Sequence, residues 1–533
     1  MRIRPRLAWL AIALAASLPY LPAVDDYFVN DDFGVVSLLA SKPAWAFFGW
    51  FTGPWMDGIW GYTPDEIRPF PAVTYQVAAL WGATSPVANH LFNIALHVVN
   101  ALLVYAVGVS AASLPVPVAA WAALAFALLP AQTETVAWVT GRVDSMPAAF
   151  YTAAFLAYVN WRARAGLARA RRLYVASIAL FFVALFTKQN TVTLPVAIVL
   201  YDLIVARRPL RLTWTWLRPY LPFVMMTAGF LLLRYVLFGE VAREGYLSTK
   251  AVEFFAETTG RHLQRLVAGE VVSGGTVAAA VALVCVVAGA LAFRSDVDRG
   301  HAARSVVFFG VIWIALGIAP TLVAGYESPR HIYLASLGTA IALGIAGHVA
   351  WHARPSRVVR PCVALAGALL LAYYSVQLHA GVRDWGVRAA VSRQATIDLE
   401  REALASPEGS LVIAGAPVRS WEWSLPFAAR APFVRSDLTR RVTLLYPELL
   451  HCCRPQWEQD ARQALETWAG RADAPPVIVL EWDARTGKLS RITNREQPFL
   501  RSVMLELRHV ADPSAFRSAL MGVIEAAGPS NDR

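Results

Sequence analysis

Long apolar runs, separated by short polar segments, fill the first 380 residues of the chain. A helix needs about 20 predominantly apolar residues to cross the hydrocarbon core of a bilayer. About eleven runs approach that length, so the pattern predicts a polytopic membrane domain over residues 1–380. The predicted spans are residues 7–24, 88–109, 117–136, 146–161, 173–187, 190–206, 219–238, 271–293, 305–324, 332–351 and 361–379.

Hydropathy falls after residue 380, and residues 381–533 have the composition of a separate globular domain. The runs "SLVIAG" and "PVIVLEW" predict strands, and "PSAFRSALMGVIEAAG" predicts a helix. No nucleophile elbow, P-loop or metal-ligand spacing occurs in this part of the sequence. The predicted fold is therefore mainly α, with about eleven transmembrane helices followed by a small α/β or α+β domain.

The composition agrees with a membrane protein. Of the 533 residues, 57% are hydrophobic, 19 are Trp and only 16% are charged, whereas a soluble protein needs more polar surface. The net charge of +11 would also suit a nucleic-acid-binding protein. The basic residues instead form short clusters between the apolar runs, which is typical of cytoplasmic loops. The sequence therefore predicts the lipid bilayer as a partner and argues against nucleic acid.

The distribution of Lys and Arg predicts an orientation. With a cytoplasmic N-terminus, the inside segments hold 18 Lys and Arg, and the outside segments hold 9 over about twice the length. By the positive-inside rule, the C-terminal domain then lies outside the cytoplasm. The first apolar run is long and no clear A-x-A cleavage site precedes Asp25, which favours a signal anchor over a cleaved signal peptide. Usage rich in Ala, Arg and Leu favours a bacterial inner membrane and a periplasmic C-terminal domain.

Polar residues at membrane depth are costly and are therefore functional candidates. Here they follow the outer ends of the predicted spans. The motif "YFVNDDF" places Asp31 and Asp32 in a large first external loop, residues 25–85, which is rich in aromatic residues. The motifs "EIRPF", "LLPAQTETVAWVTGRVDSM", "LFTKQNTVTLP" and "YESPRHIYLASLG" supply the other candidates. These are Arg68, Glu134, Arg142, Asp144, Lys188, Arg330, His331 and Tyr333.

Carboxylates and cations on one membrane face indicate transfer chemistry. A carboxylate can act as a general base, and cations can hold a phosphate group. Because cytoplasmic nucleotide sugars are not available outside, the activated donor there would be linked to a lipid phosphate. A divalent ion on the acidic pair is an alternative, although acidic pairs bind metals weakly without further ligands. No cofactor is firmly expected.

The same motifs, in the same order, resemble the membrane O-mannosyltransferases that carry tetratricopeptide repeats, a group of C-type glycosyltransferases. The resemblance covers roughly residues 25–340. It implies transfer of a single sugar from a polyprenyl-phosphate donor to a hydroxyl acceptor outside the cytoplasm, with inversion at the anomeric carbon. The repeats themselves are missing after residue 380. The acceptor therefore stays open between a protein, a glycolipid and a polysaccharide.

Roles for individual residues follow from this resemblance. It implies Asp31 as the general base and Asp32 as an assisting or positioning residue. The other candidates are assigned to the donor phosphate or sugar. Each has a simpler interpretation: a helix-capping acidic pair, cations that reach lipid headgroups, and an ion pair of Glu134 or Asp144 with Arg142.

Two further function classes remain as alternatives. A transporter or flippase of lipid-linked glycans would show charges or broken helices near mid-membrane, whereas the polar residues here gather at one face. A polymerase or ligase of lipid-linked glycans also works outside the cytoplasm and is the nearer competitor. A polar stripe of His90, Asn93, His97 and Asn100 on the second predicted span is interpreted as hydrogen bonding between helices.

Overall fold

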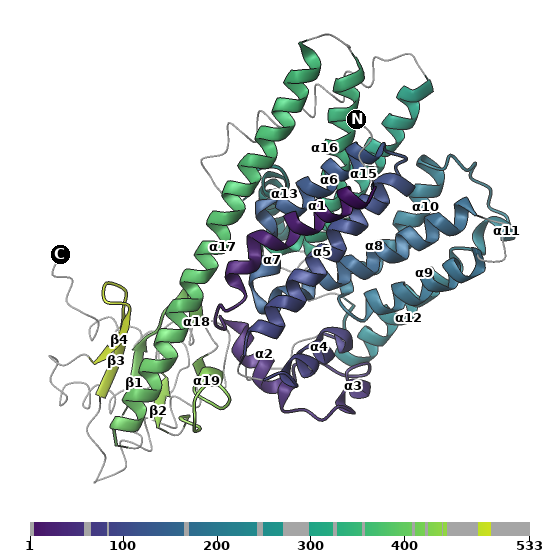
Figure 1. Ribbon diagram of the computed structural model, residues 1–533. Coiled ribbons are helices and arrows are strands. Elements are labelled where there is room, and N and C mark those ends of the chain that lie inside the picture. The colour runs from purple at the N-terminus through teal and green to yellow at the C-terminus, as the bar shows by residue number, and fades with distance from the viewer. Residues whose placement is uncertain are drawn as a thin grey trace.

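Helices make up most of the computed structural model (Figure 1). The structure describes residues 5–57, 66–82, 85–164, 170–241, 249–269, 298–322, 328–353, 358–407, 411–421, 425–439, 441–444 and 478–491. The first helices are α1 (Pro5–Ser17), η1 (Leu18–Ala23), α2 (Asp31–Ala40), α3 (Ala46–Gly49), α4 (Pro69–Ala79), α5 (Val87–Ser110) and α6 (Val116–Leu128).

The chain then bends before it enters the second half of the bundle. The bend consists of η2 (Pro130–Gln132), α7 (Thr133–Ala137) and η3 (Val139–Gly141). It is followed by α8 (Arg142–Ala163), α9 (Ala170–Leu185), η4 (Gln189–Thr193), α10 (Leu194–Ile204), α11 (Trp214–Leu217) and α12 (Leu221–Phe238). The later helices are α13 (Thr249–Ala268), α15 (Asp298–Leu322), η6 (Pro329–Ile332), α16 (Tyr333–Ala353), α17 (Val359–Ala405), α18 (Val418–Trp421) and α19 (Leu425–Ala428).

Several of these helices are long and apolar enough to cross a membrane. By length and composition, five of the described helices qualify: Pro5–Ala23, Val87–Ser110, Leu221–Phe238, Pro329–His352 and Val359–Ala405. The bent pair of α6 and the η2–α7 segment raises the number to six, and two shorter apolar helices add to them. Every predicted span coincides with helix except residues 271–293, which lie outside the described residues. The predicted number of eleven spans stays a prediction.

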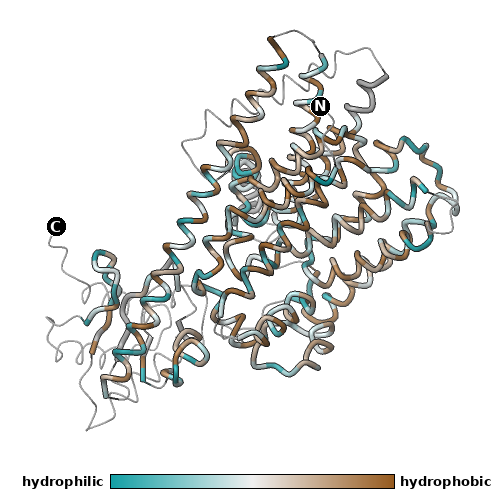
Figure 2. The backbone as a smooth tube through the Cα atoms, in the orientation of Figure 1, coloured by the Kyte–Doolittle hydropathy of each residue, from teal (hydrophilic) through white to brown (hydrophobic). Residues whose placement is uncertain are grey.

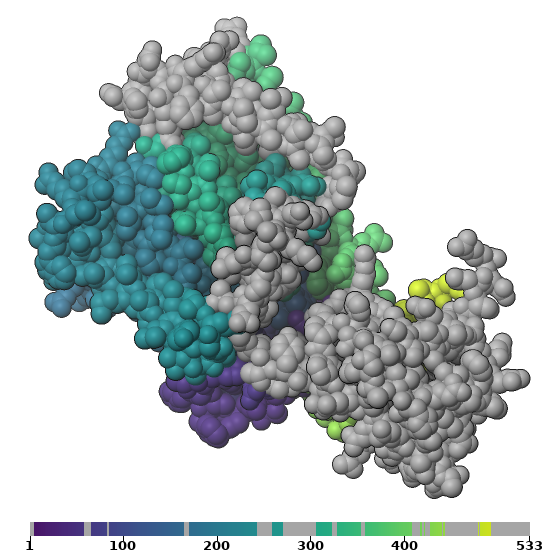
Figure 3. Space-filling model, turned by 180° about the vertical axis from the view of Figure 1, so that it is seen from behind, coloured from purple at the N-terminus to yellow at the C-terminus, as the bar shows by residue number. Residues whose placement is uncertain are grey.

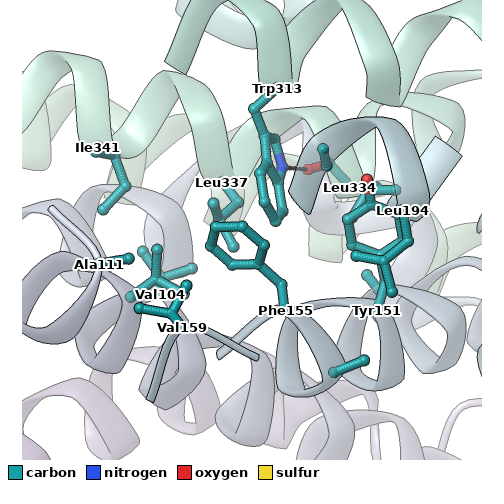
Figure 4. Packing of buried hydrophobic residues seen from close by; sticks show 14 of the residues in the cluster. Val104, Ala111, Tyr151, Phe155, Val159, Leu194, Trp313, Leu334, Leu337 and Ile341 are labelled. Atoms are coloured by element: carbon teal, nitrogen blue, oxygen red, sulfur yellow. Dashed lines mark hydrogen bonds between the residues drawn. The ribbon is translucent and has the colours of Figure 1, made fainter. Parts of the chain in front are cut away.

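Apolar residues predominate along the helices of the bundle (Figure 2). Inside it, aromatic side chains pack against one another, as in the contact between Phe155 and Trp313, whose ring centroids lie 5.0 Å apart. The indole N–H of Trp313 donates to the carbonyl of Leu334 at 3.0 Å (Figure 4). This bond ties α15 to α16 within an otherwise apolar cluster.

Small residues allow α15 and α16 to approach closely. A Cβ atom at Gly338 would lie 2.7 Å from the carbonyl oxygen of Gly310, and one at Gly317 would lie 2.8 Å from the Cα of Ala335. Membrane helices associate through such contacts because lipid tails are as apolar as the side chains and provide little hydrophobic driving force.

Helix α17 leads from the bundle toward the strands of the C-terminal part of the chain. It has 47 residues, which at 1.5 Å per residue is about 70 Å, more than twice the roughly 30 Å of a bilayer core. The helix therefore continues across the predicted boundary at residue 380. Its lower part in Figure 2 is more polar and lies beside the sheet.

A four-stranded sheet confirms mixed α/β structure after residue 405. Its strands are β1 (Leu411–Gly415), β2 (Val442–Leu444), β3 (Ile478–Asp483) and β4 (Lys488–Arg491), in the order β2-β1-β3-β4. Strand β1 runs parallel to β2 and β3, and β4 pairs antiparallel with β3. The predicted strands correspond to β1 and β3, whereas the predicted helix "PSAFRSALMGVIEAAG" lies outside the described residues.

The first loop packs against the bundle at one end. The ring of Phe51 stacks on Phe182 of α9 at 6.1 Å and lies 5.0 Å from Phe186. Figure 3 shows the purple surface of this loop against the teal surface of later helices. These contacts place α2–α4 at the end of α9 that leads into Lys188.

A buried charged cluster lies near the C-terminal end of α8. The Asp202 carboxylate is fully buried and accepts hydrogen bonds from Tyr158 at 2.7 Å and Tyr220 at 2.6 Å. Its Oδ2 atom also lies 2.7 Å from Nη2 of Arg162. The cluster ties α8, α10 and the start of α12 together, because a charge without partners would be costly in this interior.

We expect Asp202→Ala to lower the free energy of unfolding by about 3–5 kcal/mol, the usual loss when one partner of a buried ion pair is removed. Arg208→Ala is the matched control, because Arg208 lies 3.6 Å from the same carboxylate with a side chain 39% exposed. It should cost no more than about 1 kcal/mol. Unfolding in detergent, followed by circular dichroism, distinguishes them; equal losses would contradict the structural role of Asp202.

Candidate active site

The acidic pair lies in the first turn of α2, just after a sharp change in backbone direction. Asn30 precedes the helix with φ of 51°, in the left-handed region. Asp31 and Asp32 then occupy the helix N-terminus, where unsatisfied N–H groups and the helix dipole favour negative charge. The two carboxylates differ in exposure, because Asp32 is buried and Asp31 is half-buried.

Asp32 is held by hydrogen bonds on both carboxylate oxygens. Its Oδ2 accepts from the backbone N–H of Val29 at 3.0 Å. Its Oδ1 accepts from the backbone N–H of Thr140 at 2.9 Å and from the Thr140 hydroxyl at 2.6 Å. Asp32 therefore fixes α2 against η3, and Asp31 is the carboxylate of the pair with access to solvent.

Burial raises the pKa of Asp32 from 3.8 to about 7, although the bonds from Thr140 and Val29 act to lower it. The charge of the neighbouring Asp31 raises this pKa further. Placing an ionised carboxylate away from water is unfavourable, and three hydrogen bonds compensate only part of that cost.

Four charged residues from separate elements form a network, which we call the ion cluster: Glu134, Asp144, Lys188 and Arg330. Nη1 of Arg330 donates to Oε1 of Glu134 at 2.6 Å, and its Nε lies 3.3 Å from Oδ2 of Asp144. Lys188 forms an ion pair with the same Asp144 carboxylate. The Ser328 hydroxyl donates to Glu134 at 2.6 Å. Three of these charged side chains keep 10–14% of their surface exposed, whereas that of Asp144 is 2% exposed.

Trp138 connects the ion cluster to the acidic pair. Its indole N–H donates to the carbonyl of Val29 at 3.1 Å, and the N–H of Val29 holds Asp32. On the other side, the guanidinium carbon of Arg330 lies 4.7 Å from the centroid of the Trp138 ring, a cation–π distance. The acidic helix and the ion cluster are thus neighbours in one site.

Arg68 and His331 lie close to the same site. Arg68 is buried, pairs with Glu66 at 2.8 Å, and lies 5.6 Å above the ring of Trp55. The His331 ring is buried and lies within electrostatic range of Lys188, Arg330 and Arg68. A second histidine, His262 of α13, has its ring centroid 6.4 Å from that of His331.

Arg142 does not join the ion cluster. Its side chain is fully buried and donates to the Thr74 hydroxyl at 3.1 Å and to the Asn89 amide oxygen at 2.8 Å. Arg142 and Asp144 are two residues apart on α8, so their side chains point about 200° apart. The sequence allowed an ion pair of Glu134 or Asp144 with Arg142. In the structure these carboxylates pair with Arg330 and Lys188 instead.

Tyr333 also lies away from the charged residues. It is buried, and its hydroxyl is 2.7 Å from Nδ1 of His97. Asn93, in the same polar stripe of α5, donates to the carbonyl of Trp138 at 2.7 Å. Asn100 donates to the carbonyl of Ser145 at 2.9 Å. The stripe therefore joins helices by hydrogen bonds, as its spacing predicted.

Sequence reasoning passed over several residues of this site. Three of them lie inside motifs that were chosen for their charged residues: Trp138, Thr140 and Ser328. A fourth, Glu66, lies two positions before Arg68. His262 lies between the predicted spans 219–238 and 271–293, outside the predicted membrane depth, so cost at membrane depth did not point to it. Among the described residues, no group of three or more His, Cys, Asp or Glu is placed to hold a metal ion.

Similarity to known proteins in sequence is limited to part of the chain. No protein-family model matches the chain. The Protein O-mannosyl-transferase Tmtc1 of Drosophila melanogaster is 34% identical over 126 residues, which are 24% of this chain. The chain spans 14% of the length of that curated relative.

Solved structures define the class of fold. ArnT from Cupriavidus metallidurans bound to undecaprenyl phosphate superposes with a TM-score of 0.52 and 15% identity, covering 90% of this chain and 93% of that one. The apo state of ArnT gives a TM-score of 0.50 at 16% identity, with the same coverage. The chain thus shares the fold of ArnT along most of its length, and its long apolar helices are those of an integral membrane protein.

The raised pKa of Asp32 predicts a pH dependence of stability. An acid whose pKa rises from 3.8 to about 7 on folding binds its proton more tightly in the folded state. Its contribution to stability therefore falls as the pH rises from about 4 to about 7 and stays constant above that range. Between pH 5 and pH 7 the titration of Asp32 should accordingly lower the midpoint of thermal unfolding in detergent relative to a variant in which residue 32 does not titrate.

Asp32→Asn provides the comparison, because an amide oxygen still accepts from Thr140 and carries no charge at any of these pH values. The variant should lack this contribution, so its midpoint should rise relative to that of the wild type from pH 5 to pH 7. Identical slopes for the two proteins would contradict the assignment of this titration to Asp32.

Proposed function

We propose that the protein is a glycosyltransferase that moves a single sugar from a polyprenyl-phosphate donor to a hydroxyl acceptor on the external face of the membrane. The observation that carries this proposal is the junction of the ion cluster with the acidic helix through Trp138. The solved ArnT structure, whose fold the chain shares, was obtained bound to undecaprenyl phosphate. That protein's ligand supports the choice of donor class.

The ion cluster supplies cations for the donor phosphate. Arg330 and Lys188 are held in place by Glu134 and Asp144 and keep a small exposed area. Fixed cations stabilise the charge that develops on a leaving phosphate without reorganising during the reaction. His331 and Arg68 lie near enough to extend the contact to the sugar or the phosphate. The apolar carrier would lie in the bilayer beside the bundle.

Asp31 serves as the general base. The acceptor hydroxyl oxygen attacks the anomeric carbon and forms the new glycosidic bond while its proton passes to the Asp31 carboxylate. The bond between the anomeric carbon and the phosphate oxygen breaks, and its electron pair leaves with the polyprenyl phosphate. A single displacement of this kind inverts the anomeric configuration. Both oxygens of Asp32 accept hydrogen bonds, so Asp32 holds α2 in place against η3.

The location of these residues bears on the alternatives. A flippase needs polar groups through the depth of the membrane, whereas the ion cluster lies at the end of the bundle that carries the first loop. A polymerase or ligase of lipid-linked glycans would transfer a glycan rather than a single sugar, so it differs in the donor. The acceptor in this proposal is a protein, a glycolipid or a polysaccharide. The proposal places the protein in a bacterial inner membrane with a cytoplasmic N-terminus and requires no metal.

Asp31→Asn should slow transfer strongly. General-base catalysis contributes about 10²–10⁴ in rate, so consumption of the donor should fall at least about 100-fold while the donor still binds. The assay offers polyprenyl-phosphate hexoses and pentoses one at a time, with hydroxyl-bearing peptides or glycolipids, and follows the loss of the lipid-linked sugar by mass. Asp57→Asn, an exposed residue of the same loop, is the matched control. Equal activity of both variants would contradict the role of Asp31.

Arg330→Gln should weaken the binding of undecaprenyl phosphate about 10-fold or more, because a charge-assisted hydrogen bond contributes roughly 1.5–3 kcal/mol. Arg485→Gln removes the same charge from a side chain 90% exposed on the β3–β4 hairpin and should bind the lipid as the wild type does. Equilibrium binding in nanodiscs measures both. If Arg330→Gln binds undecaprenyl phosphate normally, the ion cluster is not the phosphate site.

A further inference from the structure

The segment that leads into the acidic helix is held by residues from the end of the chain. The hydroxyl of Ser392 on α17 donates to the carbonyl of Phe28 at 2.6 Å. The indole N–H of Trp421 on α18 donates to that same hydroxyl oxygen at 3.1 Å. Both side chains are fully buried. A two-bond chain therefore runs from the C-terminal domain to the backbone three residues before Asp31.

A second contact acts on the residue directly before Asp31. The backbone N–H of Asn30 donates to the carbonyl of Ser420 at 2.8 Å, and the Ser420 hydroxyl donates to the carbonyl of Arg388 on α17 at 3.0 Å. Asn30 has a φ of 51°. Such a conformation persists only where the surroundings fix it, and here it sets the direction in which α2 begins.

Aromatic packing reinforces these hydrogen bonds. The ring of Phe433 lies 5.4 Å from that of Phe28 and 4.7 Å from that of Phe33. Together with Trp421 and residues of α17 and the sheet, Phe28 and Phe33 belong to one continuous apolar cluster. The first loop and the C-terminal domain therefore share a single core, although they are far apart in sequence.

We propose that Ser392, Ser420, Trp421 and Phe433 form a clasp that positions the Asp31 carboxylate for catalysis. They are positioning residues, because they act through the Phe28–Asn30 backbone and do not touch the reacting atoms. The C-terminal domain is then part of the catalytic apparatus, whatever else it does with the acceptor. This inference rests on the proposed transferase function, because it needs Asp31 to be the base.

The geometry of a general base explains why such a clasp matters. The base must lie within about 2.6–3.2 Å of the proton that it removes, and a displacement of about 1 Å can cost about 100-fold in rate. Donor binding should not depend on the clasp, because Arg330 and Lys188 are held by Glu134 and Asp144 on other elements. The clasp should therefore affect kcat and leave the KM for the donor unchanged.

The test compares Ser392→Ala, Trp421→Phe and the double variant in the donor-consumption assay, with kcat expressed per folded molecule. Ser392→Ala removes both hydrogen bonds, and we expect kcat to fall about 10-fold, within the range known for misplaced catalytic groups. Trp421→Phe keeps the aromatic volume and should cause a smaller loss. The double variant should be no slower than Ser392→Ala alone, because both changes act through one chain of bonds.

Asp398→Asn is the matched control. Asp398 is fully buried on α17 and accepts from the backbone N–H of Leu489 at 3.1 Å, so it holds the sheet without touching the first loop. This variant should lower the thermal midpoint and leave kcat and KM unchanged.

Unchanged kcat in both Ser392→Ala and Trp421→Phe, with the wild type active, would overturn the clasp and leave the transferase function standing. Should Ser392→Ala fail to fold, Trp421→Phe alone decides in the same way. Donor consumption absent even from the wild type, with any acceptor, would instead refute the transferase function on which the clasp depends.

Discussion

The pairing of charges at one end of an apolar bundle is the constraint on which the rest of the structure depends. A lone Arg330, Lys188, Glu134 or Asp144 would be costly so close to lipid. Together they form three ion pairs, because Arg330 contacts both Glu134 and Asp144, and Lys188 contacts Asp144 as well. Because the four residues come from four separate segments, satisfying them brings α7, α8, η4 and η6 to a common point. A site with fixed cations follows from that requirement.

Much of the helical framework could be predicted because a long apolar run has few alternatives in lipid. Every backbone polar group must be satisfied within the segment, so the run forms a helix. The continuation of α17 to Ala405 could not be predicted in the same way. Its second half packs against the first loop and the sheet, and hydropathy alone does not distinguish a polar helix from a loop.

The candidate site was only partly predictable for a related reason. Cost at membrane depth identified Glu134, Asp144, Lys188 and Arg330, but it could not tell which cation faces which carboxylate. Arg142 carries the same charge as Arg330, yet its position on α8 directs it toward Thr74 and Asn89. The contacts of the Asp31 motif with Ser392 and Ser420 join residues 364 and 390 positions apart, and no local pattern encodes them.

The central claim is that a lipid phosphate binds at the ion cluster beside the acidic helix. Photo-crosslinking tests this claim most directly. The probe is undecaprenyl phosphate with a photoreactive group next to its phosphate, bound to the protein in nanodiscs. After irradiation, the labelled peptides are identified by mass spectrometry. Labelling should fall on peptides that contain Trp138, Lys188 or Arg330, and excess unlabelled lipid should suppress it. Specific labelling confined to the opposite end of the bundle, around Asp202, would contradict the account.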